Sequence, residues 1–295
     1  MKKKLILIIL IFINNILFAE SITLQPVAQN FINSMVKQHN FEKKQLELLL
    51  NKYSSNPIII EKISNPTEKL SWGEYKKLLI SDRRINRGKQ FLLEHQDVLL
   101  KAQRQFGVPK EIIVAILGIE SFYGEVTGKY PVLEALITLA FDYPPRAKFF
   151  KSELENFLLL TREEHLDPIN IMGSYAGAMS PAQFISSSYR AYAVDFAGIG
   201  SKDLNNMHNA IGSIANYFNK HGWKNNDKIA IKLNNKKSNK YDNKHAVLEF
   251  INEDNNKEHW VGFNNFYVIT KYNNSHNYAM AVYLLAKKLG LMLEN

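Results

Sequence analysis

The sequence predicts a mainly α-helical (α+β) fold with an N-terminal helical region and a small β insert. Across most of the 295 residues, apolar side chains recur at positions i, i+3, i+4 and i+7, the spacing of one buried helix face. Residues 224–262 instead contain short segments in which apolar and polar residues alternate, as in half-buried strands. With 46% apolar and 22% charged residues, the chain has the composition of an ordinary folded protein with a large core.

The first 19 residues have the pattern of a secretory signal peptide. Lys2, Lys3 and Lys4 precede an unbroken apolar run over residues 5–13, and Ala19 offers a small residue for cleavage. We therefore expect the chain to be exported and residues 1–19 to be removed. Leu17 is larger than the residue usually found two places before the cleavage site, which leaves a retained membrane anchor as the alternative.

Charge and cysteine content exclude some functions. The formal charge is +9, and it falls to +6 without the three lysines of the signal, because 34 basic and 28 acidic residues remain. No basic block is interleaved with aromatic residues, so nucleic acid is not expected as a partner. The chain has no cysteine, which excludes a thiol nucleophile and leaves the core, not disulfides, to stabilise an exported protein.

An N-terminal helical region is expected over residues 20–105. Apolar residues have helical spacing around residues 31–36 and 46–50. Pro57, Asn65-Pro66 and Gly73 should interrupt the pattern, and one polar helix should follow over about residues 89–105.

Residues 106–290 are expected to form the second region. Pro109 suits the first turn of a helix that Gly124 can end with a positive φ, and Pro131 and Pro144-Pro145 should break the following chain into short segments. Ser152 is the predicted cap of the next helix. The remaining predictions are helices over residues 210–220 and 277–289, a strand at 229–233 in the β insert, and a strand at 267–270.

Glu120 interrupts the apolar face of the helix expected after Pro109. Ile113, Ile116 and Leu117 form an apolar stripe, and Glu120 occupies its next position, at i+7 from Ile113. Burial and the nearby helix C-terminus both disfavour a charged carboxylate, so its pKa should rise toward the range that a general acid needs near neutral pH. The alternative is a glutamate that pairs with Arg or Lys or reaches solvent, which is the commoner case for such a residue considered alone.

An ordered series of short motifs runs through the chain. They are Ile-Glu-Ser-Phe-Tyr-Gly at 119–124, Pro-Pro-Arg-Ala-Lys-Phe-Phe at 144–150, Gly-Ser-Tyr-Ala-Gly-Ala-Met at 173–179, Gln-Phe at 183–184, Tyr-Ala-Val-Asp-Phe at 192–196, Ala-Ile-Gly-Ser-Ile-Ala-Asn-Tyr-Phe at 210–218, Thr-Lys-Tyr-Asn at 270–273 and Tyr-Ala-Met-Ala-Val at 278–282. Over residues 71–289 this series resembles the lytic murein transglycosylases of the B family, glycoside hydrolase family 103. The resemblance implies a lysozyme-like helical catalytic core over residues 106–290, with the β insert at 224–262 within it.

The resemblance also implies a reaction. The family cleaves the β-1,4 bond between N-acetylmuramic acid (MurNAc) and N-acetylglucosamine (GlcNAc) in peptidoglycan, and a 1,6-anhydro-MurNAc end forms because the C6 hydroxyl of the muramic acid attacks its own C1. Glu120 matches the family's lone catalytic residue, which acts as general acid and then as general base. One carboxylate suffices because the substrate itself supplies the nucleophile. Most glycosidases need a second carboxylate, which either acts as the nucleophile or activates a water.

Eight further positions match substrate-binding residues of the family. Ser174 and Gln183 correspond to polar residues beside the glutamate, and Arg146 to a basic residue on the substrate path. Tyr75 corresponds to an aromatic residue of the N-terminal region. The matches in the C-terminal half are Tyr217, Tyr272, Asn273 and Tyr278. Each position has a structural alternative: Tyr278 lies on an apolar helix face and could belong to the core, and Ser174 could be a turn or capping residue.

No metal or other cofactor is expected. Many relatives carry an EF-hand-like loop where this chain has Asp195, but Ala197 and Ile199 replace two of its oxygen ligands. Asn206 stands where a bidentate Glu is required. The eight histidines are scattered without His-Glu-x-x-His spacing, which disfavours a metallohydrolase. One further departure from the family is Ser180, at a position where relatives often have Gly.

Two other functions remain open from the sequence. A muramidase-type hydrolase would keep the fold and Glu120 but would activate water with a second carboxylate, for which the candidates are Glu125, Asp142, Glu153 and Asp195. A non-catalytic peptidoglycan-binding protein would keep the fold alone. The expected partners are peptidoglycan glycan strands, and the chain is expected to be a periplasmic monomer, with association at the outer or inner membrane left open.

Overall fold

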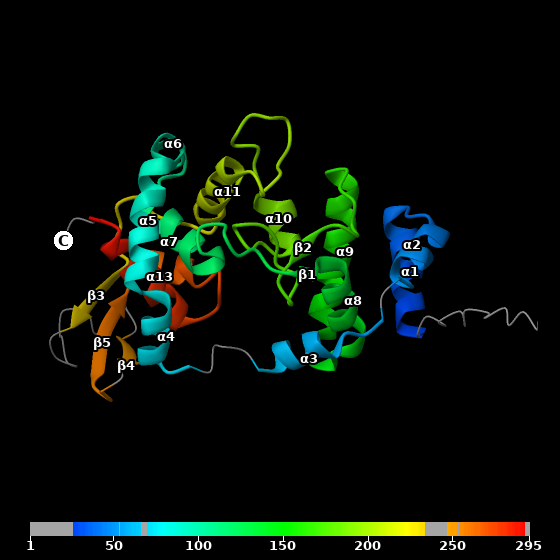
Figure 1. Cartoon of the computed structure of the whole chain (residues 1–295), viewed down its shortest axis with the longest axis horizontal. Helices are drawn as coiled ribbons and strands as arrows, with labels where there is room; N and C mark the ends of the chain where they lie inside the picture. The colour runs from blue at the N-terminus through cyan, green and yellow to red at the C-terminus, as the bar shows by residue number, and fades with distance from the viewer. Residues whose placement is uncertain (1–25, 53, 66–69, 234–246, 253, 293–295) are drawn as a thin grey trace, which may run out of the picture. The chain divides into compact units, whose positions relative to one another are not determined.

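The computed structural model describes residues 26–52, 54–65, 70–233, 247–252 and 254–292. The chain divides into two compact units, residues 1–52 and 53–295. Helices dominate both units and strands are few and short, which confirms the predicted mainly helical α+β fold (Figure 1). The predicted signal peptide, residues 1–19, lies outside the described residues. None of the helices in the described part of the chain is long and apolar enough to cross a membrane.

The first unit contains two described helices, α1 (Pro26–His39) and α2 (Lys43–Leu50). Ile32 and Met35 of α1 and Leu46 and Leu50 of α2 are buried, as their helical spacing predicts. Asn40, between the helices, has a φ of 56°, a left-handed conformation that asparagine tolerates better than most residues.

The second unit carries the remaining elements. Its helices are α3 (Pro57–Ser64), α4 (Trp72–Leu79), α5 (Asp82–Glu94), α6 (Gln96–Phe106), α7 (Lys110–Ser121), α8 (Val132–Asp142), α9 (Ala147–Glu163), α10 (Ser186–Tyr192), α11 (Met207–Lys220), α12 (Asn264–Ile269) and α13 (His276–Lys288), with a 3-10 turn, η2 (Pro144–Arg146). Helix α3 packs on α8, α5 packs on α7, and α6 packs on α7 and α11. Residues 53–105 therefore pack with the rest of this unit, and the domain boundary expected near residue 105 stays a prediction.

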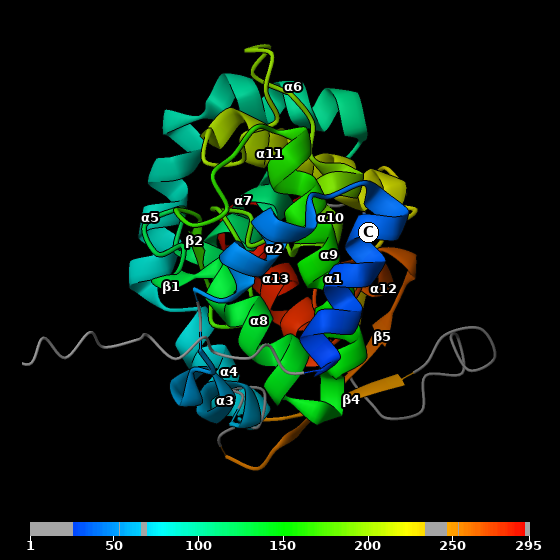
Figure 2. The same ribbon diagram turned by 90° about the vertical axis from the view of Figure 1, so that its right-hand side faces the viewer.

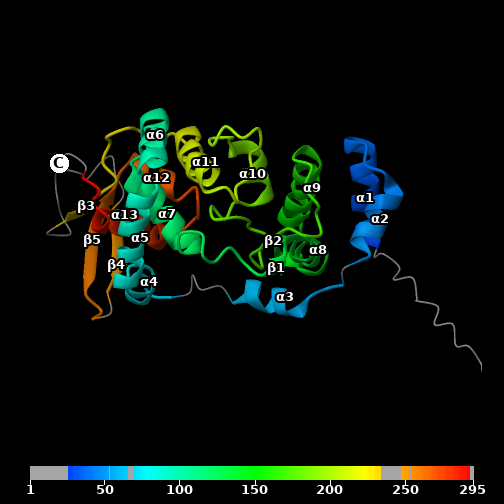
Figure 3. The ribbon, with the colours of Figure 1, turned by 45° about the horizontal axis from the view of Figure 1, so that its top comes forward.

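Two small antiparallel sheets accompany the helices. The β insert is a three-stranded sheet in the order β3-β5-β4, formed by β3 (Ala230–Leu233), β4 (Val247–Ile251) and β5 (Lys257–Gly262). Its register pairs Ala230 with Gly262 and Val247 with Val261. The second sheet is a short pairing of β1 (Tyr130–Pro131) with β2 (Met172–Gly173). Figure 3 shows this pairing beside α8, and the β insert lies beside α13 in Figures 1 and 3.

Helix α7 forms the centre of the second unit. Residues 112–117 are completely buried, and α7 packs against both α13 and α5, as the views in Figures 2 and 3 agree. Ile113, Ile116 and Leu117 thus form the apolar stripe predicted from their spacing. The helix begins one residue later than expected. Pro109 has a ψ of 136°, which is not helical, so it is the N-cap residue and α7 starts at Lys110.

Several local predictions were wrong. The single helix expected over residues 89–105 is two helices, α5 and α6, because His95 leaves the helical conformation with a φ of −118°. Ser152 lies inside α9, which begins at Ala147 because η2 places the chain in a helical turn before it. The chain between Pro131 and η2 is the unpredicted helix α8, whose residues are buried on nearly every side and so lack a polar face.

The strand expected at residues 267–270 is also wrong, because this segment belongs to helix α12 and the turn after it. Val268 and Ile269 are β-branched and buried, a composition that favours a strand in the absence of other information. Packing of α12 on α13 and β5 overrides that local preference. The helices expected at 210–220 and 277–289 are confirmed as α11 and α13.

Candidate active site

Glu120 is the penultimate residue of α7, and the chain turns sharply after it. Phe122, Tyr123 and Gly124 all have left-handed backbones, with φ of 49°, 64° and 90°. The positive φ expected at Gly124 is therefore present, but the helix ends before it, at Ser121. Three successive left-handed residues are costly for non-glycine side chains, so the surrounding contacts must hold this turn in place.

Two anchors hold the turn. Ser121 is buried, and its hydroxyl accepts a hydrogen bond from the N–H of Gly124 (3.0 Å) and donates to the carbonyl oxygen of Pro181 (2.7 Å). The Tyr123 hydroxyl donates to the carbonyl oxygen of Arg84 on α5 (2.7 Å). Gly118 permits this, because a Cβ there would lie 2.7 Å from the same hydroxyl oxygen. Glu120 is thus carried on a rigid helix end that is tied to a distant loop.

Tyr278 contacts Glu120 directly. It lies in the first turn of α13 and is almost completely buried, and its hydroxyl donates to Oε1 of Glu120 at 2.5 Å. Burial raises the pKa of Glu120 to about 7, while the hydrogen bond from Tyr278 acts in the opposite direction. The glutamate nevertheless keeps partial solvent exposure. A partly accessible carboxyl group with a pKa near neutrality can both give and take a proton.

Tyrosine side chains surround this pair. The rings of Tyr272 and Tyr278 are parallel, with centroids 6.5 Å apart, and the Tyr272 hydroxyl donates to the carbonyl oxygen of Ala182 (2.5 Å). Burial first and then the charge of Glu120 raise the pKa of both tyrosines well above its ordinary value, so both remain neutral donors. Tyr75, buried on α4, also contributes to the raised pKa of Tyr278 and thus belongs to the same neighbourhood.

Three predicted residues line one pocket of about 160 Å³: Gln183, Tyr217 and Tyr272. The side-chain amide of Gln183 donates to the carbonyl oxygens of Thr127 (2.9 Å) and Ser180 (2.8 Å). The Tyr217 hydroxyl donates to the carbonyl oxygen of Lys271 (2.5 Å). Since Tyr272 also stacks parallel to Tyr278, this pocket adjoins the Glu120–Tyr278 pair.

The other three predicted residues have different surroundings. The Ser174 hydroxyl accepts hydrogen bonds from the N–H groups of Ala176 and Ala178, so it organises a turn. Arg146 is exposed on η2, with its guanidinium 4.4 Å from the centroid of the Phe149 ring. Asn273 follows Tyr272 and is half-buried between α12 and α13. Within the described part of the chain, no hydrogen bond or ring contact joins these three to Glu120.

Sequence reasoning overlooked two residues of this region. Ser121 ties the end of α7 to the loop at Pro181, and its position directly after Glu120 was the available signal. His221 stacks on Tyr217, with ring centroids 4.0 Å apart, and stands four residues after it, so both lie on one face where α11 ends. The pairing of Ser121 with Pro181 joins residues 60 apart in the chain, which no local pattern shows.

The loop that begins at Asp195 does not fit a calcium ion. The Asp195 carboxylate accepts hydrogen bonds from the N–H groups of Ile199 (3.0 Å) and Gly200 (2.7 Å). Asn206 uses its side-chain oxygen to cap α11, by accepting from His208 and Asn209. The oxygens that an EF-hand loop would turn toward the ion are therefore engaged by backbone amides, and positions 197 and 199 supply none. No cluster of potential metal ligands occurs among the described residues.

Comparison with known proteins assigns the chain to a class. Residues 23–287 match the family described as the transglycosylase SLT domain. The chain is 37% identical over 300 residues to the membrane-bound lytic murein transglycosylase B of Escherichia coli (strain K12), with 90% of this chain and 83% of that protein covered. Together with the helical fold and Glu120, these matches define a lytic transglycosylase with a lysozyme-like core.

Solved structures agree with this assignment. The soluble lytic transglycosylase SltB1 of Pseudomonas aeruginosa is 41% identical, with a TM-score of 0.82 over 90% of this chain and 98% of that one. The lytic transglycosylase Slt35 of Escherichia coli, solved in complex with bulgecin A, is 38% identical, with a TM-score of 0.82 over 90% of this chain and 92% of that one. The chain therefore belongs to the lytic murein transglycosylases of the transglycosylase SLT family.

Proposed function

We propose that Glu120 is the single acid and base with which this lytic transglycosylase cleaves the MurNAc-β-1,4-GlcNAc bond of peptidoglycan. The named relatives are lytic murein transglycosylases, which supports murein as the substrate. The observation that carries the proposal is the pKa of about 7 that burial gives Glu120, in direct contact with Tyr278.

The proposed reaction needs one proton-carrying group. Protonated Glu120 donates its proton to the glycosidic oxygen as the bond from MurNAc C1 to that oxygen breaks, which releases the GlcNAc hydroxyl. The resulting Glu120 carboxylate then removes the proton of the MurNAc C6 hydroxyl as its oxygen forms a bond to C1. The products are a free GlcNAc 4-hydroxyl and a 1,6-anhydro-MurNAc end, Glu120 is protonated again, and no water is consumed. A pKa near the working pH serves both steps.

Three of the four candidate second carboxylates of a hydrolase have other partners; Asp142 is the fourth. Glu125 pairs with Arg87 (2.9 Å), Glu153 accepts from the N–H of Ser187 (3.0 Å), and Asp195 accepts from two N–H groups of its own loop. This favours intramolecular attack by the sugar over attack by an activated water, which remains the alternative.

The tyrosine-lined pocket supports a place for the sugar rings. Tyr217, Tyr272 and Gln183 present aromatic faces and a polar side chain next to the Glu120–Tyr278 pair, the combination that carbohydrate sites use. We assign Tyr75, Arg146, Ser174 and Asn273 to the same substrate path on the strength of the family match, with Ser174 acting through the turn it organises. Export to the periplasm by residues 1–19, activity as a monomer and association with a membrane are further parts of this proposal.

Product analysis tests the proposal. Purified protein is incubated with murein sacculi, and the released fragments are analysed by mass spectrometry. We expect 1,6-anhydro-MurNAc ends, which lack one water relative to the reducing ends that a hydrolase produces. Reducing ends alone would establish the muramidase-type hydrolase. Binding to sacculi without any released fragment, at several pH values, would establish the non-catalytic binding protein.

A further inference from the structure

A second pocket, of about 400 Å³, lies between α4, α13 and the turn that follows β4. It shares no residue with the Glu120 site. Its walls carry charges of both signs: Lys76 and Lys77 come from the last turn of α4, Lys288 ends α13, and Asp254 follows β4. Pockets of this volume are typical of small-ligand sites.

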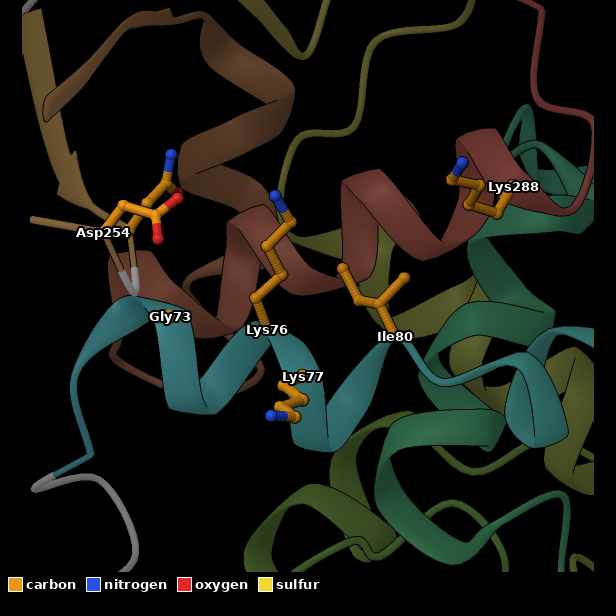
Figure 4. Close-up of a pocket in the computed structure, with 7 residues that line it drawn as sticks. Gly73, Lys76, Lys77, Ile80, Asp254 and Lys288 are labelled. Carbon is orange, nitrogen blue, oxygen red and sulfur yellow. The ribbon is translucent and has the colours of Figure 1, made fainter. Parts of the chain in front are cut away.

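The charges are arranged along the pocket. Figure 4 shows Asp254 at one end of the pocket, Lys288 at the opposite end, and Lys76 between them. Within the described part of the chain, neither Lys76 nor Lys288 nor Asp254 forms an ion pair. The pocket therefore offers one acidic end and one basic end, both available to a ligand.

Asn252 adds an unused acceptor at the acidic end. Its side-chain nitrogen donates to Glu258 (2.9 Å), but its side-chain oxygen, Oδ1, is buried and has no hydrogen-bond partner in the described residues. A buried acceptor without a donor costs about 1–3 kcal/mol. Asn252 lines the pocket beside Asp254, so this end of the pocket is short of hydrogen-bond donors.

We propose that this pocket binds a short peptide that carries both a free amine and free carboxylates, namely the peptide stem of peptidoglycan. Such stems bear α-carboxylates and, on their diamino acid, a free ammonium group. The ammonium lies at Asp254 and Asn252, and a carboxylate lies between Lys76 and Lys288. The identity of the ligand rests on the proposed function, whereas the preference for a zwitterion rests on the pocket alone.

The mixed charge separates this ligand from an anionic membrane. Lysines that bind lipid headgroups attract a surface of one sign, and a carboxylate among them would weaken that attraction. Here Asp254 lines the same pocket as the lysines. A zwitterionic peptide uses both signs, so we favour the stem over a lipid headgroup.

Calorimetric titration with the tripeptide N-acetyl-L-alanyl-γ-D-glutamyl-meso-diaminopimelate, whose one free amine is that of the diamino acid, tests the proposal. We expect the double substitution Lys76→Ala and Lys288→Ala to weaken binding roughly tenfold. The matched control removes the same charge elsewhere, with Lys220→Ala and Lys224→Ala, and should leave binding unchanged. Acetylation of the free amine of the tripeptide should weaken binding to the wild type, and Asp254→Asn should remove that discrimination.

Three outcomes would overturn the proposal: absence of tripeptide binding, equal loss in the two double variants, or binding of vesicles with anionic lipid that depends on Lys76 and Lys288 while the tripeptide does not bind. Cleavage of glycan strands stripped of peptides is measured in parallel. The Lys76/Lys288 variant should cleave these at the wild-type rate but show a raised KM on peptide-bearing sacculi. Failure to cleave stripped glycan would count against the proposed function, whereas tripeptide binding tests the pocket separately.

Discussion

Glu120 and Glu153 are both glutamates on core helices, but their surroundings differ. Glu153 lies inside α9, is only 4% exposed, and accepts a hydrogen bond from the N–H of Ser187 in the first turn of α10. A helix start presents N–H donors and the positive end of the helix dipole, which suit a charged carboxylate. Glu120 lies at the other kind of helix end, in the last turn of α7, with a tyrosine hydroxyl as its partner.

This contrast shows that burial alone does not make a catalytic acid. Glu153 accepts a hydrogen bond from a backbone N–H, and it links α9 to α10 as a structural group. At Glu120 burial outweighs the single hydrogen bond from Tyr278 and raises the pKa to about 7. The two glutamates differ in their partners, a backbone N–H for Glu153 and a tyrosine hydroxyl for Glu120.

The largest expected effect is on catalysis. Glu120→Gln should lower the rate of fragment release from sacculi by about 10³-fold, since general acid-base catalysis contributes on the order of 10²–10⁴. Glu153→Gln keeps an oxygen that can accept from Ser187, so its rate should stay within a few-fold of the wild type. Release of anhydro ends, quantified by chromatography, measures both variants. A loss in Glu153→Gln as deep as in Glu120→Gln, at unchanged melting temperature, would make Glu153 a second catalytic carboxylate.

The next effect is on the pH dependence of stability. The pKa of Glu120 is about 7 in the folded chain, against an ordinary 4.5, so between these values the folded state keeps a proton that the unfolded chain has lost. Stability therefore falls as pH rises through this window and levels off above it. In the wild type this fall in the free energy of unfolding is at most about 3 kcal/mol, and it is smaller because solvent partly reaches the carboxyl group. Glu120→Gln should abolish it. Urea unfolding at pH 5 and pH 8 measures it, and parallel behaviour of the two proteins would contradict the raised pKa.

Tyr278→Phe should have a smaller effect on both rate and pH profile. The hydroxyl donates to Glu120 and holds its pKa down, so its removal should raise that pKa further and shift the pH dependence of kcat/KM upward. We expect roughly a tenfold loss of rate at neutral pH from the less well oriented carboxyl group. Tyr283→Phe, on the same helix but bonded to the Ala230 carbonyl, is the control and should not move the profile. An unshifted pH profile in Tyr278→Phe would show that this hydrogen bond does not determine the pKa of Glu120.

The sequence predicted those parts that have an internal period or a strong local signal. The stripe of α7, the faces of α11 and α13, and the place of Glu120 follow from spacing alone. Helix α8 was missed because it is buried nearly all round, and α12 because its β-branched residues favour a strand until α13 packs on them. Within the site, the contact of Tyr278 with Glu120 joins residues 158 apart, so the family motifs, not the spacing, brought these residues together.

The smallest expected effect is at Ser180. This buried polar residue has no hydrogen-bond partner comparable to the one of Glu153, and it does not share the acid-base role of Glu120. It is 4% exposed, its φ is 67°, and its hydroxyl has no hydrogen-bond partner in the described residues. Ser180→Gly removes the orphaned hydroxyl and suits the left-handed backbone, and the greater freedom of the unfolded glycine chain offsets part of the gain. We expect a stabilisation of about 1 kcal/mol, a rise of roughly 2 °C in the melting temperature, with activity unchanged. Ser180→Ala removes only the hydroxyl and should gain less, so an alanine variant at least as stable as the glycine one would show that the backbone conformation carries no cost here.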